Sequence, residues 1–164
     1  MRVTVRRPPL LTVLVALGIV IADQASKAVV LAFADRLPYT VAGGLRIELV
    51  RNTGVSFSLF TGSGFVIAGV AAVVVALLVL FLVLPRVYSM PLAILLGGSL
   101  GNLIDRLHAD GSVVDFIAVY WWPRWNIADA AIVVGACLMV LTVVRRAPHA
   151  PRPDDGGGPQ LPDG

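Results

Sequence analysis

Three aspartates stand in settings that are unusual for a carboxylate. Asp105 ends a glycine-rich apolar run, Asp115 is flanked by valines, phenylalanine and isoleucine, and Asp129 lies near the start of another apolar run. Two carboxyl groups that meet can share one proton, so that one activates water as a base while the other donates a proton. These residues are therefore candidates for hydrolysis by acid–base catalysis. The apolar neighbours of Asp115 predict a raised pKa, although an isolated aspartate can also simply anchor a turn.

Other polar side chains occur at helical spacing. An ionisable group at bilayer depth costs about 2.5 to 3.5 kcal/mol, so each one needs a partner or a wet cavity. Asp23 and Lys27 are four residues apart on one helix face, where they can pair, and a purely structural ion pair fits this spacing equally well. Asn102, Asp105 and Arg106 share a face by the same rule.

Asn126 and Asp129 repeat this three-residue spacing at the expected start of the last apolar run. Asparagine is a favoured N-cap, which accounts for Asn126 as a structural residue but leaves Asp129 unexplained. All these polar groups are expected to lie at one depth, near the same ends of the first, third and fourth apolar runs. This convergence predicts a site more strongly than any single residue does.

Two other kinds of hydrolytic site fit less well. A metal site is disfavoured because the two histidines are His108 and His149, and His149 lies in a tail expected on the opposite face. Adjacent helical residues do not face each other, which argues against Ser26 with Lys27 as a nucleophile and base. The serines without a plausible histidine base are Ser26, Ser56, Ser58 and Ser99. We therefore expect no metal.

The elements that must position these residues are four apolar runs. Of the 164 residues, 57% are hydrophobic and only 14% charged, and the mean hydropathy is +0.86. This composition predicts an all-α integral membrane protein with one embedded domain over residues 1–146. The predicted helices cover about 10–34, 65–84, 90–107 and 127–144. A cleaved leader is the alternative for the first run, and three further spans weigh against it.

Two segments, 35–64 and 108–126, remain outside the helices. In the first, the stretches Tyr39–Val41, Leu45–Val50 and Val55–Leu59 are β-prone and are separated by glycine and asparagine turn signals, which predicts a small sheet. The second mixes Val113–Val119 with a tyrosine and three tryptophans. Because these aromatic residues prefer the headgroup layer, we expect a loop at the membrane interface.

The arginines set the expected orientation. The first segment, the Pro85–Ser89 turn and the tail after Val144 hold seven of the thirteen basic residues, and should face the cytoplasm. Four crossings place both termini there. The tail over 147–164 is rich in proline, glycine and aspartate and is predicted to be disordered. Scattered arginines argue against nucleic-acid binding, and the lone Cys137 is expected to be a small buried hydrophobe.

The polar residues lie in five short strings that resemble the motifs of the lipoprotein signal peptidase family, also called signal peptidase II, in the family's order. The strings are Asp23-Gln24-Ala25-Ser26-Lys27, Arg51-Asn52-Thr53-Gly54, Gly97-Gly98-Ser99-Leu100-Gly101-Asn102-Leu103-Ile104-Asp105-Arg106, Val113-Val114-Asp115-Phe116 and Asn126-Ile127-Ala128-Asp129.

The resemblance implies a four-helix enzyme with a small extracytoplasmic β-cradle and a catalytic aspartate pair, Asp115 and Asp129. Asp105 is the rival for one place. We prefer Asp115 because Asp105 adjoins Arg106 and shares a helix face with Asn102, which suits a supporting role. The residues then expected to shape the site or hold substrate are Asp23, Lys27, Asn52, Gly54, Asn102, Asp105, Arg106 and Asn126.

Two departures from the family pattern concern the surroundings of these strings. After Gly54 the family usually continues with two alanines, an aromatic residue and a glycine, whereas Val55-Ser56-Phe57-Ser58 stands here. This difference bears on the geometry of the cradle rather than on the chemistry. Trp125 stands before Asn126, where phenylalanine is usual.

The implied substrate is a prolipoprotein with a diacylglyceryl group on its lipobox cysteine, cut on the amino side of that cysteine. We expect a monomer in the bacterial cytoplasmic membrane with its active site near the extracytoplasmic face. Its expected partners are lipid-modified prolipoproteins and membrane lipids, without a cofactor or nucleic acid. Two other classes stay open. They are a small transporter with an ion path along Asp23, Lys27, Asp105 and Arg106, and an assembly factor that binds helices through Gly97 and Gly101.

Overall fold

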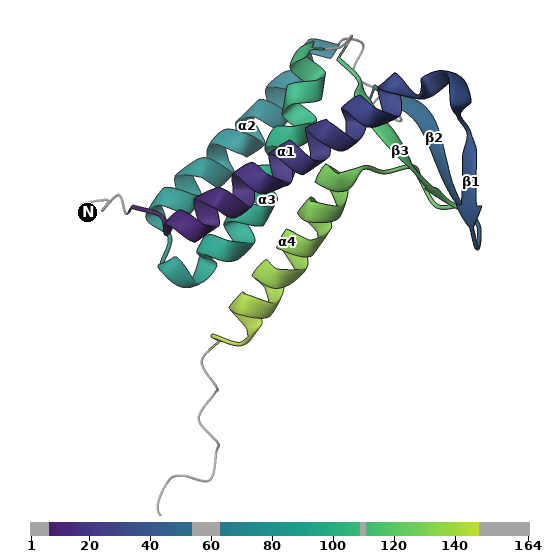
Figure 1. Cartoon of the computed structure of the whole chain (residues 1–164). Helices are drawn as coiled ribbons and strands as arrows, with labels where there is room; N and C mark the ends of the chain where they lie inside the picture. Colours follow the sequence, from purple (N-terminus) through teal and green to yellow (C-terminus); the bar gives the residue numbers. More distant parts are fainter. Residues whose placement is uncertain (1–6, 54–62, 109–110, 148–164) are drawn as a thin grey trace, which may run out of the picture.

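Four long helices form a bundle, and a small sheet lies at one end of it (Figure 1). The computed structural model describes residues 7–53, 63–108 and 111–147. Within these residues, four helices are long and apolar enough to cross a membrane, which confirms the predicted four-helix membrane fold. They are α1 (Leu10–Ala32), α2 (Ser63–Val83), α3 (Ser89–His108) and α4 (Ile127–Val144).

The helix ends differ slightly from the expected ones. α1 begins after Pro9, whose carbonyl accepts a hydrogen bond from the Thr12 hydroxyl at 2.7 Å. It ends two residues earlier than expected, because a short 3-10 helix, η1 (Ala34–Arg36), follows. Pro85 separates α2 from η2 (Arg86–Tyr88), which leads directly into α3. These junctions shift the predicted bounds of three helices by one or two residues.

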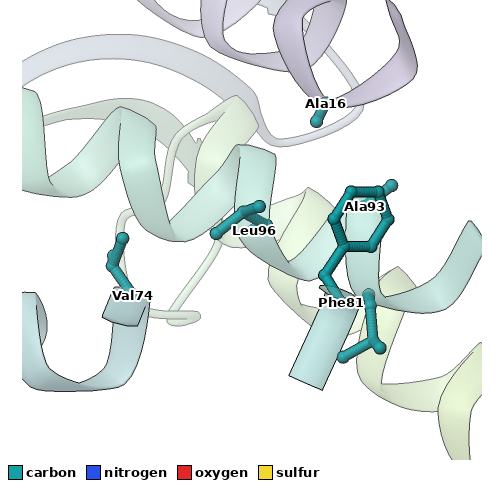
Figure 2. Packing of buried hydrophobic residues seen from close by; sticks show 6 residues of the cluster. Ala16, Val74, Phe81, Ala93 and Leu96 are labelled. Atoms are coloured by element: carbon teal, nitrogen blue, oxygen red, sulfur yellow. The ribbon is translucent and has the colours of Figure 1, made fainter. Parts of the chain in front are cut away.

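The central helix is α3, which packs against each of the other three helices. Its buried Ala93 and Leu96 meet Ala16 of α1 and Val74 and Phe81 of α2 (Figure 2). Glycines in α3 allow this close approach. A methyl group at Gly97 would lie 2.8 Å from the Ala16 carbonyl oxygen, and one at Gly98 would lie 2.5 Å from that of Ala128. The glycine face thus lets α1 and α4 pack closely against α3.

The outward faces of the bundle are apolar. Large hydrophobic side chains are exposed on α1, α2 and α4, including Leu14, Val75 and Val140. Apolar surface of this extent is suited to the hydrocarbon of a bilayer, where the helices satisfy their own backbone groups. Cys137 also lies exposed on α4, so the expectation that it is buried was wrong. Cys137 lies on a side of α4 whose apolar side chains face outward, away from the bundle.

The sheet has three antiparallel strands in the order β1 (Tyr39–Ala42), β2 (Leu45–Asn52) and β3 (Val113–Val119). β1 and β2 confirm two of the predicted strands. The third predicted strand, Val55–Leu59, lies outside the described residues. Instead, residues predicted to form an interfacial loop make β3, because the β-branched and aromatic run Val113–Val119 can pair along the whole of β2. The sheet therefore joins the two external segments.

Turn geometry orders the tip of the sheet. Gly43 and Gly44 connect β1 and β2 with positive φ angles of 55° and 82°, which glycine adopts without strain. The Tyr120 ring lies directly over Gly44, where a Cβ would be 2.4 Å from that ring. The Tyr120 amide also donates to the Gly44 carbonyl at 3.2 Å. Past Tyr120 the chain turns back, through the two exposed tryptophans 121 and 122, toward the start of α4.

Candidate active site

Pairing of β2 with β3 places Asp115 beside Asn52. In the register of the two strands, Val50 lies opposite Asp115 and Asn52 lies opposite Val113. The Asn52 side-chain amide donates to Asp115 Oδ2 at 3.0 Å. Asp115 is only 2% exposed, so its carboxyl group is held almost entirely by protein groups. The sequence predicts a loop at this residue, whereas the structure has a strand, which gives the Asp115 side chain a defined direction.

Asn126 and Asp129 cap α4 together. The backbone amide of Asp129 donates to Asn126 Oδ1 at 2.9 Å, and the backbone amide of Asn126 donates to Asp129 Oδ2 at 3.2 Å. This reciprocal pair is a capping box, and it confirms Asn126 as the N-cap. The expectation that capping leaves Asp129 unexplained was wrong, because its second oxygen closes the box. One oxygen of Asp129 is thereby tied to the backbone of the site.

Two asparagines connect the carboxyl groups of Asp115 and Asp129. The fully buried Asn126 donates from Nδ2 to Asp115 Oδ1 at 2.7 Å, with a longer contact to Asn102 Oδ1 at 3.2 Å. Asn102 in turn donates from Nδ2 to Asp129 Oδ1 at 2.8 Å. Each aspartate is thus one hydrogen bond away from Asn126. The site joins a strand, the end of α3 and the start of α4.

A buried ionic group from α1 and α3 supports this cluster. Lys27 lies 2.7 Å from Asp23 and 2.9 Å from Asp105, measured between its Nζ and a carboxylate oxygen of each. The predicted pair of Asp23 with Lys27 is confirmed, and Asp105 joins it. Gln24, which is not among the predicted site residues, donates to Asp105 Oδ1 at 2.8 Å and to the Gly101 carbonyl at 3.2 Å. Its place in the polar band beside Asp23 was the available signal.

Arg106 lies beside Asn102 at the edge of the cluster that adjoins α2. Its guanidinium donates to the Asn102 carbonyl at 3.3 Å, while its buried Nε has no partner in the described part of the chain. Arg106 and Asn102 line a cavity of about 310 Å³ between α2, α3 and α4. Nine of the ten predicted site residues are therefore gathered around one cluster. The tenth, Gly54, lies outside the described residues.

Two further cavities flank the aspartates. One of about 410 Å³ is lined mostly by polar residues, among them Arg51, Asn52, Asp115 and Arg124. The other, of about 480 Å³, lies beside Asp129 and is mostly apolar. Its wall is formed by Trp122, Pro123, Arg124, Trp125, Ala130, Val133 and Val134. The two cavities adjoin each other, because Pro123 and Arg124 line both of them.

The surroundings of Asp115 favour its protonated form. Burial raises the pKa of Asp115, and the nearby negative charge of Asp129 raises it further. Hydrogen bonds from Asn52 and Asn126 and the positive charge of Lys27 act in the opposite direction. The net direction is upward, as the apolar neighbours of Asp115 predict. Such a carboxyl group retains its proton more readily than one in water, which suits a proton donor.

The sequence matches the profile of the family described as signal peptidase (SPase) II over residues 15–145. Several similar proteins are lipoprotein signal peptidases. The one from Paraburkholderia phytofirmans is 40% identical over 147 residues, which cover 80% of this chain and 83% of that protein. The one from Syntrophomonas wolfei is 38% identical over 131 residues, covering 77% and 87%. The one from Rhodococcus jostii is 37% identical over 153 residues, covering 87% and 77%.

Two solved structures also resemble this fold. Both are described as bacterial membrane enzymes determined by the in meso method. The structure at 1.9 Å resolution has a TM-score of 0.78 and 25% identity, covering 89% of this chain and all of that chain. The structure at 2.3 Å resolution has a TM-score of 0.74 and 26% identity, covering 86% and 92%.

Proposed function

This chain belongs to the signal peptidase II family, and we propose that Asp115 and Asp129 are its catalytic pair. The observation that carries this proposal is the position of Asn126. Its side chain binds Asp115 Oδ1 at 2.7 Å, while its backbone amide binds Asp129 Oδ2 at 3.2 Å. One residue thus holds both carboxyl groups, which come from two consecutive elements, the strand β3 and the helix α4.

The proposed reaction is direct hydrolysis of a peptide bond. One carboxylate takes a proton from water, and the water oxygen forms a bond to the peptide carbonyl carbon. The other carboxyl group, still protonated, donates its proton to the carbonyl oxygen. The first carboxyl group then passes the proton that it took from water to the leaving nitrogen as the carbon–nitrogen bond breaks, and the second regains its proton as the carbonyl re-forms. The raised pKa of Asp115 favours this residue as the proton donor. No covalent intermediate and no cofactor is required.

The proposed substrate is a diacylglyceryl-modified prolipoprotein, cut on the amino side of its lipidated cysteine. The relatives carry the name lipoprotein signal peptidase, which suggests this class of substrate. The cavities support it chemically. The polar cavity beside Asp115 suits a peptide backbone, and the apolar cavity beside Asp129 suits aliphatic chains. The scissile peptide bond, which joins the signal peptide to the lipidated cysteine, would then lie next to both carboxyl groups.

A cleavage assay with a synthetic diacylglyceryl-modified precursor in detergent micelles tests this function. Replacing Asp115 or Asp129 with asparagine removes a proton-transfer group, so each variant is expected to lose about 1000-fold in rate. Product masses determine whether the cut falls before the cysteine. Asp105→Asn should lose less activity, since Asp105 binds Lys27 and the Val114 amide rather than the Asn126 side chain.

The matched control is Asp35→Asn, the same chemical change at an exposed residue of η1. This variant should cleave at the wild-type rate. Near wild-type cleavage by both Asp115→Asn and Asp129→Asn would end the proposal. A loss in Asp105→Asn equal to that in Asp129→Asn, together with an active Asp115→Asn variant, would assign the pair to Asp105 and Asp129 instead.

A further inference from the structure

Lys27 is the point where the buried charges of two helices meet. It is 3% exposed, and its ammonium group contacts a carboxylate oxygen of Asp23 on α1 and of Asp105 on α3. Two carboxylates in a buried site repel each other, and their desolvation is costly without a cation between them. Lys27 therefore allows both carboxylates to remain close together.

Each of these carboxylates also holds the backbone immediately before a proposed catalytic residue. Asp105 Oδ2 accepts a hydrogen bond from the Val114 amide at 3.0 Å, next to Asp115. Asp23 Oδ1 accepts one from the Ala128 amide at 2.9 Å, next to Asp129. The same ammonium thus links both backbone segments that carry the aspartate pair.

A third contact of Lys27 leads to Asp129 through the side chain of Asn102. Lys27 Nζ lies 3.4 Å from Asn102 Oδ1, and Asn102 Nδ2 donates to Asp129 Oδ1 at 2.8 Å. Because Asn102 receives one hydrogen bond from Lys27 and gives another to Asp129, its amide orientation follows from both partners. The contacts of Lys27 therefore bear on the position of Asp129 along two routes.

We infer that Lys27 is a positioning residue, which sets the separation of Asp115 and Asp129 through Asp105, Asp23 and Asn102. This inference rests on the proposed function, because it concerns the same pair of aspartates. Lys27 itself acts through these partners and not on the reacting atoms. A misplacement of about 1 Å at reacting groups can cost on the order of 100-fold in rate, so an effect of that size is expected when the link is lost.

Replacing Lys27 with methionine removes the ammonium and keeps a flexible side chain of similar length. Per folded enzyme, the variant should lose about 100-fold in kcat, while KM for the lipidated precursor stays within about twofold. Lys27→Arg restores a cation that can bind both carboxylates and should recover most of this loss. Thermal unfolding in detergent gives the folded fraction of each variant.

A second pair of variants tests the link without changing any charge. A methyl group at Gly101 would lie 2.7 Å from Asp23 Oδ2, so Gly101→Ala pushes this carboxylate away. Gly97→Ala is the matched control, because it adds the same methyl group to α3 but meets the Ala16 backbone instead, at 2.8 Å. Both variants should be less stable than the wild type. Gly101→Ala should lose more kcat per folded enzyme than Gly97→Ala, because only its methyl group meets the Asp23 carboxylate itself.

The outcomes separate this inference from the proposed function. Inactive Asp115→Asn and Asp129→Asn variants beside a fully active Lys27→Met would overturn the inference alone. So would a Lys27→Met defect confined to KM, since Lys27 would then hold substrate. Equal kcat values for Gly101→Ala and Gly97→Ala would also contradict it, and they decide the question if Lys27→Met does not fold. Active Asp115→Asn and Asp129→Asn variants would instead remove the proposed function itself.

Discussion

Both carboxyl oxygens of Asp115 accept hydrogen bonds from side-chain amides, and the residue has almost no access to water. The two donors, Asn52 and Asn126, favour its ionised form, but burial outweighs them and raises its pKa. The neighbouring charge of Asp129 acts in the same direction as burial. In the proposed pair, Asp115 is therefore the residue more suited to carry the shared proton.

The raised pKa of Asp115 has a consequence for stability against pH. Below the ordinary carboxyl pKa of 3.8, Asp115 is protonated in both the folded and the unfolded chain. As pH rises past this value, the unfolded chain loses its proton first, so the free energy of unfolding falls until the folded group also ionises. Asp115→Asn cannot ionise. Its melting temperature minus that of the wild type should therefore increase as pH rises from about 3.8.

Thermal unfolding in detergent over a series of pH values measures this difference. Asp35→Asn, at the exposed η1 position, serves as the control and should show no such trend. A constant difference between Asp115→Asn and the wild type at all pH values, or one that decreases with rising pH, would contradict the raised pKa.

At the scale of the elements, the start of α4 has two tasks in one residue. Asn126 caps the helix through Oδ1 and binds Asp115 through Nδ2. An N-cap contributes about 1 kcal/mol to stability. A hydrogen bond to a charged or shared-proton carboxyl contributes about 1.5 to 3 kcal/mol. The two tasks use different atoms, so substitutions can separate them.

Asn126→Ser keeps an oxygen that can cap α4, whereas Asn126→Ala has none. Both variants lose the hydrogen bond to Asp115, which costs about 1.5 to 3 kcal/mol, and we expect the alanine variant to be less stable than the serine variant by about a further 1 kcal/mol. Both lack the amide that binds Asp115, so both should lose about tenfold to a hundredfold in cleavage rate. Denaturant unfolding and the precursor assay measure the two effects. A serine variant with full activity would show that the Asn126 to Asp115 bond does not position the pair.

At the scale of the whole molecule, the bundle has two chemically different ends. The first turn of α1, the junction of α2 with α3 and the last turn of α4 lie at the end away from the sheet (Figure 1). These segments contain or adjoin four arginines, which are Arg7, Arg86, Arg145 and Arg146. The other end carries the sheet and the exposed tryptophans 121 and 122. By the positive-inside rule, we propose that the sheet end faces the extracytoplasmic side.

Labelling of single cysteines in intact cells tests this orientation. In a Cys137→Ser background, Trp121→Cys places a thiol at a residue that is 87% exposed at the sheet end. A membrane-impermeant maleimide should label it without permeabilisation. Arg86→Cys, at the opposite end, should react only after the membrane is opened. The reverse pattern would invert the topology and place the proposed active site on the cytoplasmic side.

Local patterns in the chain are enough to predict several features. Uninterrupted apolar runs predict the four spans, because a helix in hydrocarbon satisfies its backbone internally and needs only length and hydropathy. Spacing of four residues predicts the pair of Asp23 with Lys27, and the residue type of Asn126 predicts the cap of α4. Each of these features depends on residues within a turn or two of each other.

Other features arise only when distant segments pack. β3 forms because β2 offers a partner strand, and the pairing brings Asn52 to Asp115. Asp105 lies beside Lys27 and Gln24, although its sequence neighbour is Arg106. Asp23 binds the Ala128 amide across 105 positions of sequence. Helix crossings and strand register set such contacts, and neither leaves a periodic signal in the chain.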